Sequence, residues 1–396
     1  MVVYLDNAAT TPLEPEVLAA YTAALAVVGN PASIHGHGQR AKRMLEESRE
    51  GLAEVVGCEP VEVVFTSGGT EAINFALKGL YWARNRDGAR PAIAFPAGEH
   101  HATTDSLEWL EQHEDAELIE IALDEQARVA PGAFRDALER TGERMALATV
   151  IWANNEVGTI QPVSELSAVA QEHGVPLHLD AVGALGAVPI DFEAVGAAAM
   201  SLSAHKIGGP VGVGALVLSR GATVVPLLHG GGQQRRVRSG TQDVAGAVAF
   251  ATAARLAQDR LEADRVRMTA LRERLIAGVL EIDPSAVLRG ASGSARLPGN
   301  AHFTFPGCDG DSLLFLLDMA GVSVSTGSAC TAGVSELSHV LLGMGVSESD
   351  ARGALRMTLG HSSDDTDVDA FLSALPTALE QARRAGHSSR RPLLGR

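Results

Sequence analysis

A lysine and an aspartate stand directly after two apolar runs of the sequence. The run VPLHLD (175–180) ends in Asp180, and the run AAMSLS (198–203) is followed three residues later by Lys206. If both runs are neighbouring parallel strands, this carboxylate and this amine lie at the same edge of a sheet. One interpretation is a buried ion pair. The other is that Lys206 holds pyridoxal phosphate as a Schiff base while Asp180 pairs with the pyridinium nitrogen.

A third segment has the composition of a phosphate site. FTSGGTEAIN (65–74) follows the apolar run VEVVFT (61–66), and Gly69 and Thr70 stand where a helix would open. The free backbone N–H groups and the dipole of such a helix favour a bound phosphate. An ordinary turn from a strand into a helix explains the same residues, so both interpretations stay open.

The cysteines indicate one thiol that works alone. Cys58, Cys308 and Cys330 are odd in number, and their spacing fits neither a disulfide framework nor a CxxC metal pair, so we expect no metal site. Cys330 stands among small residues without apolar anchors, which predicts a mobile loop. A nucleophilic thiol needs nearby positive charge, because a pKa of about 8.5 leaves few thiolates at neutral pH. Cys58 and Cys308 are interpreted as structural.

The elements that position these residues alternate along the chain. Apolar runs at 61–66, 92–96, 147–151, 175–180 and 198–203 are separated by amphipathic stretches, which is typical of a parallel α/β sheet. Apolar residues then recur at helical spacing from Thr241 to about Asp283, which predicts one or two long helices joining two domains.

The remaining segments predict a smaller α+β domain. It contains strands at 301–305 and 354–359 and a final helix that begins near Ser362. We therefore expect a large α/β domain over 1–255, a small domain over 256–385 and a disordered tail over 386–396, with the first 15 or so residues packed against the small domain.

Composition narrows the function. The 396 residues carry a formal net charge of −16, which disfavours nonspecific binding to nucleic acid. No apolar run reaches the roughly 18 residues of a membrane span, and the first residues lack the basic start of a secretory signal. We expect a cytoplasmic protein that binds small molecules.

Ten motifs together resemble one family. They are YLDNAATTP (4–12), GNPAS (29–33), FTSGGTEAIN, GEHHA (98–102), NNEVGT (154–159), HLDA, SAHK, HGGG (229–232), RSGT (238–241) and GSACT (327–331). In this order the motifs resemble the cysteine desulfurases, pyridoxal-phosphate enzymes of aminotransferase class V. The resemblance implies the type I aminotransferase fold, a homodimer, and conversion of L-cysteine into L-alanine with a persulfide on the enzyme.

The resemblance also implies roles for single residues. Those implied to bind the cofactor's phosphate are Gly69, Thr70, Ser203, His205 and, from the partner subunit, Thr241. On the cofactor ring, the resemblance implies that His100 stacks on its face, Asp180 pairs with its nitrogen and Lys206 is its anchor and a base. For the substrate, it implies that Arg356 binds the carboxylate, Asn155 lies near both cofactor and substrate, and Cys330 is the nucleophile. The long segment around Cys330 resembles the subgroup that serves iron-sulfur assembly or tRNA thiolation, which implies a sulfur-acceptor protein.

One position departs from the family. The family usually has a glutamine that bonds the cofactor's phenolate oxygen where this chain has Gly183. This departure leaves room for a slow or specialised desulfurase. Another class V enzyme, such as a selenocysteine lyase or an aminotransferase, and a cofactor-bearing scaffold for sulfur transfer are the alternatives.

Overall fold

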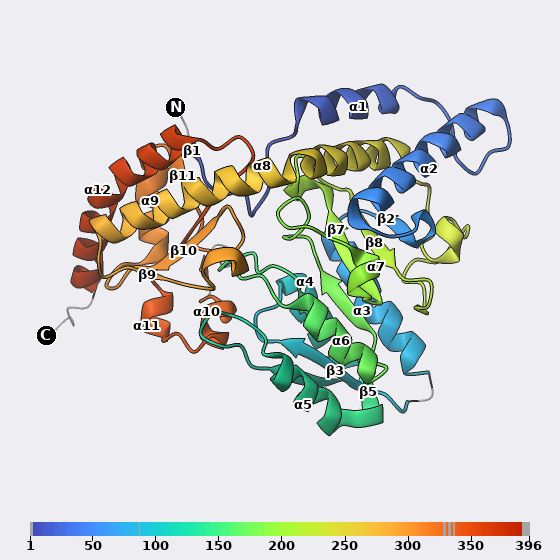
Figure 1. Cartoon of the computed structure of the whole chain (residues 1–396), viewed down its shortest axis with the longest axis horizontal. Coiled ribbons are helices and arrows are strands. Elements are labelled where there is room, and N and C mark those ends of the chain that lie inside the picture. Colours follow the sequence, from blue (N-terminus) through green and yellow to red (C-terminus); the bar gives the residue numbers. More distant parts are fainter. Residues whose placement is uncertain (1–2, 87, 328–329, 332–333, 336, 390–396) are drawn as a thin grey trace, which may run out of the picture.

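The computed structural model (Figure 1) describes residues 3–86, 88–327, 330–331, 334–335 and 337–389. For residues 328–336 and those beyond 384, no side chain is described. The described chain forms a large sheet covered by helices and, beside it, a smaller set of strands and helices.

A sheet of seven strands forms the larger part of the molecule. Its strands, in spatial order, are β2 (Val63–Thr66), β8 (Gly214–Leu218), β7 (Ala199–Ser203), β6 (Leu177–Asp180), β5 (Met145–Ile151), β3 (Ala92–Pro96) and β4 (Glu117–Ile121). β8 is antiparallel to both of its neighbours, whereas β7, β6, β5, β3 and β4 pair in parallel. The carboxyl ends of β6 and β7 therefore lie next to each other.

Helices cover both faces of this sheet, as alternating side chains require. Val63 and Phe65 of β2 point into a core with α2, α5, α6 and α8, while Val64 points into a second core with α3 and α4. The helices of this part are α1 (Pro15–Leu25), α2 (Gly36–Val56), α3 (Gly69–Arg84), α4 (His101–Glu114), α5 (Pro131–Thr141), α6 (Val163–Glu172) and α7 (Phe192–Val195). Both sides of the central strands are buried, and their side chains are mostly apolar. Among the exceptions, Thr149, His178 and Ser201 form a hydrogen-bonded row across β5, β6 and β7.

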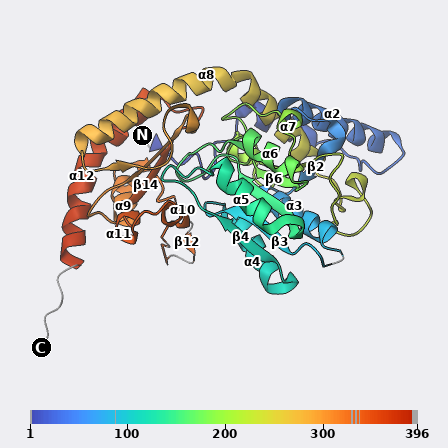
Figure 2. The same ribbon diagram turned by 60° about the horizontal axis from the view of Figure 1, so that its bottom comes forward.

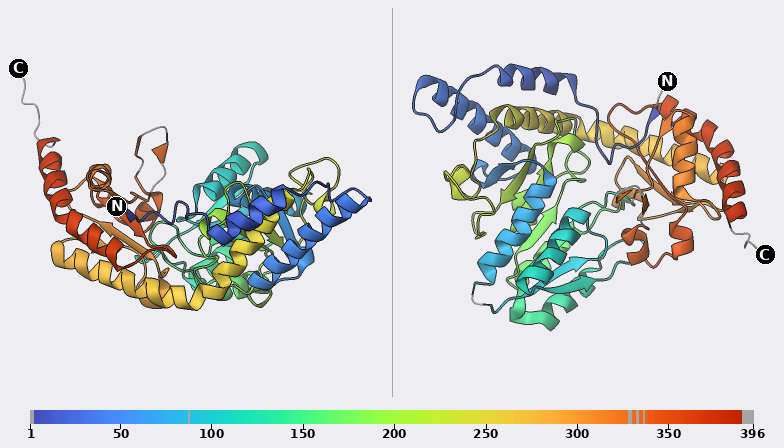
Figure 3. Two further views of the ribbon diagram at one scale, coloured as in Figure 1. Left: turned by 90° about the horizontal axis from the view of Figure 1, so that it is seen from above. Right: turned by 180° about the vertical axis from the view of Figure 1, so that it is seen from behind.

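A single long helix, α8 (Val244–Ile282), leads from the large sheet to the smaller part, and Figure 2 and the left view of Figure 3 show it running along the molecule. The smaller part has its own apolar core, built from the end of α8 and the elements that follow. These elements are β9 (Val287–Leu288), β10 (Asn300–Thr304), α9 (Gly310–Met319), β11 (Val322–Ser323), β12 (Cys330–Thr331), β13 (Val334–Ser335), α10 (His339–Gly343), α11 (Glu348–Ala351), β14 (Ala354–Thr358) and α12 (Asp365–Ser389).

The beginning of the chain lies against the smaller part. β1 (Val3–Tyr4) pairs with β11, and Val3 and Leu5 are buried in the same core as α12. Asp6 forms a bridge with Thr358 of β14, and Thr11 then donates its N–H to the carbonyl of His205. The first residues thus connect the small core to the segment that carries Lys206.

The five apolar runs predicted as strands of the sheet are strands, with ends that move by up to two residues. β4 and the antiparallel β8 were not predicted. The apolar repeat from Thr241 forms one helix, so the expected boundary at 255/256 falls inside α8. α12 continues to Ser389, past the expected start of the tail at 386, while 390–396 lie outside the described residues.

Candidate active site

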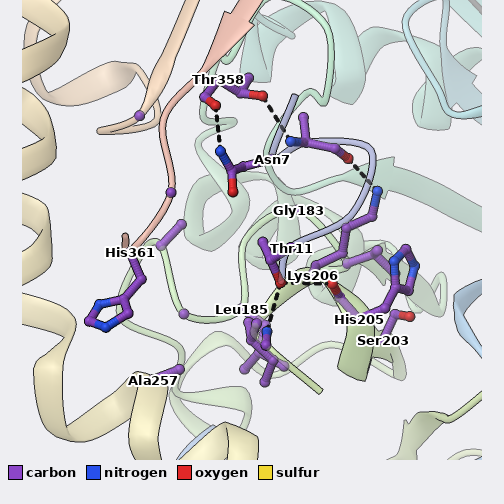
Figure 4. A pocket seen from close by; sticks show the side chains of 18 of the residues that line it. Asn7, Thr11, Gly183, Leu185, Ser203, His205, Lys206, Ala257, Thr358 and His361 are labelled. Carbon is purple, nitrogen blue, oxygen red and sulfur yellow. Dashed lines mark hydrogen bonds between the residues drawn. The ribbon is translucent and has the colours of Figure 1, made fainter. Parts of the chain in front are cut away.

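A cavity of about 580 Å3 lies at the carboxyl ends of β6 and β7. This volume is typical of a site for a small molecule or cofactor. Eight residues predicted for the site line it, namely Gly69, Thr70, His100, Asn155, Asp180, Ser203, His205 and Lys206. Figure 4 shows Ser203, His205 and Lys206 together at one end, with His361 and Ala257 at the other.

Lys206 ends a short 3-10 turn, Ala204–Lys206, directly after β7. Its Nζ donates to the carbonyl oxygens of Ala8 and Ala9, the latter at 2.9 Å. Burial, and next the positive charge of Arg356, lower the pKa of Lys206 to about 8, against the opposing effect of Asp180 and Asp6. A large fraction of this amine is therefore neutral, and nucleophilic, near physiological pH.

Asp180 ends β6 and is almost fully buried. Its Oδ1 accepts the N–H of Val182 at 3.0 Å. Burial raises the pKa of Asp180 to about 6, although this hydrogen bond and the charge of Lys206 lower it. A cationic ring nitrogen beside Asp180 would favour the ionised carboxylate and so offset the effect of its burial.

The start of α3 leaves donors open toward the cavity. Its N-cap, Gly68, provides no side-chain cap, so the first N–H groups of the helix are free to bind an anion. A Cβ at Gly69 would lie 2.7 Å from Cγ2 of Val182, so only glycine fits there. The hydroxyl of Ser203 is buried and has no hydrogen-bond partner among the described residues. A phosphate bound here would satisfy both the helix terminus and this hydroxyl.

His100 is the N-cap of α4, and its Nδ1 accepts the N–H of Ala102 at 3.0 Å. This bond places the ring proton on Nε2. Burial and the neighbouring charge of Lys206 lower the pKa of His100 to about 4. The ring is therefore neutral at physiological pH, as suits a flat side chain that covers an aromatic cofactor.

Arg356, in β14, is 4% exposed and lies behind the cavity wall rather than in it. Its Nη1 donates to the carbonyl of Asn155 at 2.9 Å, and its Nη2 donates to Asp6 at 2.7 Å. Its Nε is buried without a partner among the described residues. Three of the five guanidinium N–H groups are thus left for another ligand.

Of the predicted residues whose side chains are described, Arg356 and Thr241 do not line the cavity of this single chain. Thr241 is exposed and does not line it. The backbone of Cys330 begins β12, which pairs with β13, but its side chain lies outside the described part of the structure. Gly183 does line the cavity, and a Cβ there would meet a single atom within 4 Å, the carbonyl oxygen of Ala153 at 3.0 Å.

Sequence reasoning missed two buried acids next to these residues. Glu99 is fully buried, its Oε1 accepts the N–H of Ile151 at 2.7 Å, and burial together with the charge of Asp180 raises its pKa to about 8. Glu156 is also buried, and burial raises its pKa to about 7. The sequence did contain a signal for them, because Glu99 stands in GEHHA and Glu156 in NNEVG, and each of these motifs follows a predicted strand.

The residues present fit pyridoxal phosphate. The helix terminus and Ser203 suit its phosphate, Asp180 suits its ring nitrogen, and the amine of Lys206 suits its aldehyde. Within the described ranges, no three or more His, Cys, Asp or Glu side chains form a metal-binding group. None of the helices that the structure describes is long and apolar enough to cross a membrane.

Comparison with known proteins agrees with this geometry. Residues 3–371 match the family Aminotransferase class-V. An IscS-like cysteine desulfurase of Mycobacterium tuberculosis is 52% identical, over 96% of this chain and 97% of its own. A solved NifS-like protein has a TM-score of 0.88 and 33% identity, over 96% of this chain and 100% of its own. A solved structure of SspA in complex with cysteine has a TM-score of 0.78 and 28% identity, over 90% of this chain and 98% of its own. The chain therefore belongs to the class V aminotransferases, and within them to the cysteine desulfurases.

Proposed function

We propose that the chain binds pyridoxal phosphate through Lys206 and moves the sulfur of L-cysteine to Cys330, releasing L-alanine. The observation that carries this proposal is the placement of Asp180 and Lys206 at adjacent strand ends in one cavity, beside the open start of α3. When bound, the cofactor withdraws electrons from the substrate's α-carbon, which loosens the neighbouring bonds.

Lys206 carries protons in this proposal. With a pKa of about 8, its amine can both accept a proton from the substrate's α-carbon and return one to the product. His100 is neutral and does not compete for that proton, since its pKa is about 4. Asp180 remains the buried anion opposite the ring nitrogen.

Arg356 and Asn155 orient the substrate. The three unused N–H groups of Arg356 suit a carboxylate, and its bonds to Asn155 and Asp6 fix the guanidinium plane. The similar protein SspA was solved in complex with cysteine, which supports cysteine as the substrate of this chain. Because Arg356 does not line the cavity, this role requires the residues between the guanidinium and the cavity to move when the substrate binds.

The thiolate of Cys330 attacks the substrate's sulfur. An S–S bond forms as the C–S bond breaks, and the electron pair of the C–S bond goes to the substrate's β-carbon, which takes up one proton to become the methyl group of alanine. The enzyme is left with a persulfide, which a sulfur-acceptor protein or a reductant removes. We propose an acceptor protein of iron-sulfur assembly or tRNA thiolation and a cytoplasmic location.

We also propose a homodimer. The N-terminal arm exposes apolar side chains that a monomer would leave in water: Leu18 is 50% exposed, Leu25 61%, Val28 77% and Ile34 92%. A second copy covering this surface would bury it, since large exposed apolar patches mark interfaces. Thr241, exposed in one chain, would then complete the phosphate site of the partner. The division into domains at 1–255 and 256–385 likewise remains a proposal.

One assay tests the activity. Purified protein loaded with pyridoxal phosphate is incubated with L-cysteine and a reductant, and sulfide and alanine are measured for wild type, Cys330→Ser and Lys206→Ala. We expect both products in equal amounts from wild type and almost none from either variant. Sulfide from Cys330→Ser would remove Cys330 from the reaction, and a keto acid in place of alanine would indicate an aminotransferase. No product from wild type would favour the scaffold.

A further inference from the structure

The two flanks of the segment that carries Cys330 meet at one buried carboxyl group, that of Glu156. On the following side, the hydroxyl of Ser338 donates to Oε2 of Glu156 at 2.5 Å. On the preceding side, Gly327 lies beside the same carboxyl, because a Cβ there would be in ordinary contact with Oε2 at 3.6 Å and in tight contact with Nε2 of His302 at 3.3 Å. One carboxyl group thus lies between the two ends of the segment.

Glu156 is itself rigidly held. Its N–H donates to Oδ1 of Asn154 at 2.9 Å, and its carbonyl accepts from Nδ2 of Asn300 at 3.0 Å. The neighbouring carbonyl of Asn155 accepts from Arg356. Glu156 therefore belongs to the same backbone segment as Asn155, which lines the cavity and binds Arg356, so the position of Glu156 is fixed relative to the cavity.

The hydroxyl of Ser338, on the flank that follows Cys330, makes a second hydrogen bond. Ser338 is 3% exposed, and its Oγ also accepts the N–H of Leu341 at the start of α10. The next residue, His339, bonds through Nε2 to the carbonyl of Glu99 at 2.7 Å. α10 is thus fastened to both acidic motifs, GEHHA and NNEVGT, through its first turn.

We propose that Glu156 is a positioning residue that fixes the flank after Cys330 through its bond to Ser338, next to the preceding flank at Gly327, and so sets how readily Cys330 reaches the substrate's sulfur. This inference rests on the proposed function. The groups that face the carboxyl are Ser338, Arg356 and His101, which favour its ionised form, and the neutral ring of His302. Burial outweighs them and raises the pKa of Glu156 to about 7, so a neutral amide is a fair substitute.

The test separates sulfur transfer from cofactor and substrate binding. Cofactor-loaded wild type, Glu156→Ala, Ser338→Ala, the double variant and Glu156→Gln are mixed with L-cysteine. The change in cofactor absorbance reports substrate binding, and alkylation followed by peptide mass analysis reports persulfide on Cys330. Ser48→Ala is the control, because Ser48 is another buried serine with a hydrogen bond, in α2.

We expect Glu156→Ala and Ser338→Ala each to slow persulfide formation about tenfold, the double variant to be no slower, and the absorbance change to stay at the wild-type rate. Glu156→Gln, which keeps an acceptor oxygen, should recover most of the rate, and Ser48→Ala should match wild type. Wild-type persulfide formation by Ser338→Ala, equal slowing of the absorbance change, or failure of Glu156→Gln to recover the rate would each overturn the inference. Absence of persulfide in wild type would instead overturn the proposed function.

Discussion

Asp6 and Arg356 are 350 positions apart in the sequence, yet Nη2 of Arg356 donates to Oδ1 of Asp6 at 2.7 Å. The arginine side chain is 5% exposed and that of the aspartate 22%. The pair fastens the beginning of the chain to β14, at the back of the cavity.

Removing one partner of this pair should therefore destabilise the protein. Asp6→Ala leaves the guanidinium buried beside one fewer acceptor, and we expect a loss of about 2–3 kcal/mol in the free energy of unfolding. Urea unfolding measures it. Glu380→Ala is the control, because its ion pair with Arg384 is exposed on α12 and should contribute almost nothing. Equal losses for the two variants would show that the buried position of Arg356 is unimportant.

The pKa of Lys206 predicts how cofactor loading depends on pH. A neutral amine attacks the cofactor's aldehyde, and burial gives Lys206 a pKa of about 8. The rate of loading should therefore rise with pH through about 8 and level off above it. Absorbance of the protein mixed with pyridoxal phosphate follows the reaction. A midpoint near 10, the ordinary value for lysine, would contradict the burial argument.

Local pattern was sufficient for much of this fold. Buried parallel strands are largely apolar, so the runs ending at Asp180 and Ser203 could be recognised, and the polar residues at their ends predicted the candidate site. β4, with the sequence ELIEI, was missed because two exposed glutamates interrupt its apolar residues at the edge of the sheet. β8 was not predicted, and its place in the sheet depends on pairing with β2, which is far away in the sequence, as well as with β7.

The buried residues around the site were harder to predict than those proposed to react. Lys206 and Asp180 are revealed by where they stand relative to strands, whereas Glu99 and Glu156 gain their properties from burial by distant elements. Ser338 contacts Glu156 across 182 positions, and no local spacing indicates such a contact. Arg356 was predicted through the resemblance, but its place behind the cavity wall was not.

The buried carboxyl of Glu99 predicts a pH-dependent stability. Its pKa is raised from the usual 4.5 to about 8, so between these values the folded state binds more protons than the unfolded state, and stability falls as pH rises. Glu99→Gln abolishes this dependence and keeps an acceptor for Ile151. We expect the variant to gain stability over wild type from pH 5 to pH 8, by about 1.4 kcal/mol for each pKa unit at most.

Urea unfolding across that pH range is the measurement, with Glu111→Gln as the control, since Glu111 is an exposed residue of α4. A constant difference between Glu99→Gln and wild type at all pH values would show that Glu99 has an ordinary pKa. The control should show no pH-dependent difference.

Gly183 predicts an altered titration of the bound cofactor. The position lines the cavity and lacks the amide donor that the resemblance to the cysteine desulfurases implies there, so the protonated form of the proposed cofactor linkage to Lys206 should persist to a higher pH. Gly183→Gln should move the midpoint of the cofactor's absorbance titration to lower pH. Gly183→Ala meets the same carbonyl of Ala153 without adding a donor and is the matched control. Identical curves for wild type and Gly183→Gln would exclude a role for the missing amide.

Gly327 predicts that close packing beside Glu156 matters for sulfur transfer. Its φ is 89°, which favours glycine, and an added Cβ would press on His302 at 3.3 Å. Gly327→Ala should slow persulfide formation about tenfold while the cofactor's absorbance stays normal. Gly345→Ala is the control, because Gly345 has a φ of 80° but nothing within 4 Å of an added Cβ, so it shares the backbone strain and lacks the contact. Equal slowing of both variants would assign the effect to strain alone, and normal transfer in Gly327→Ala would show that the approach to Glu156 and His302 does not position Cys330.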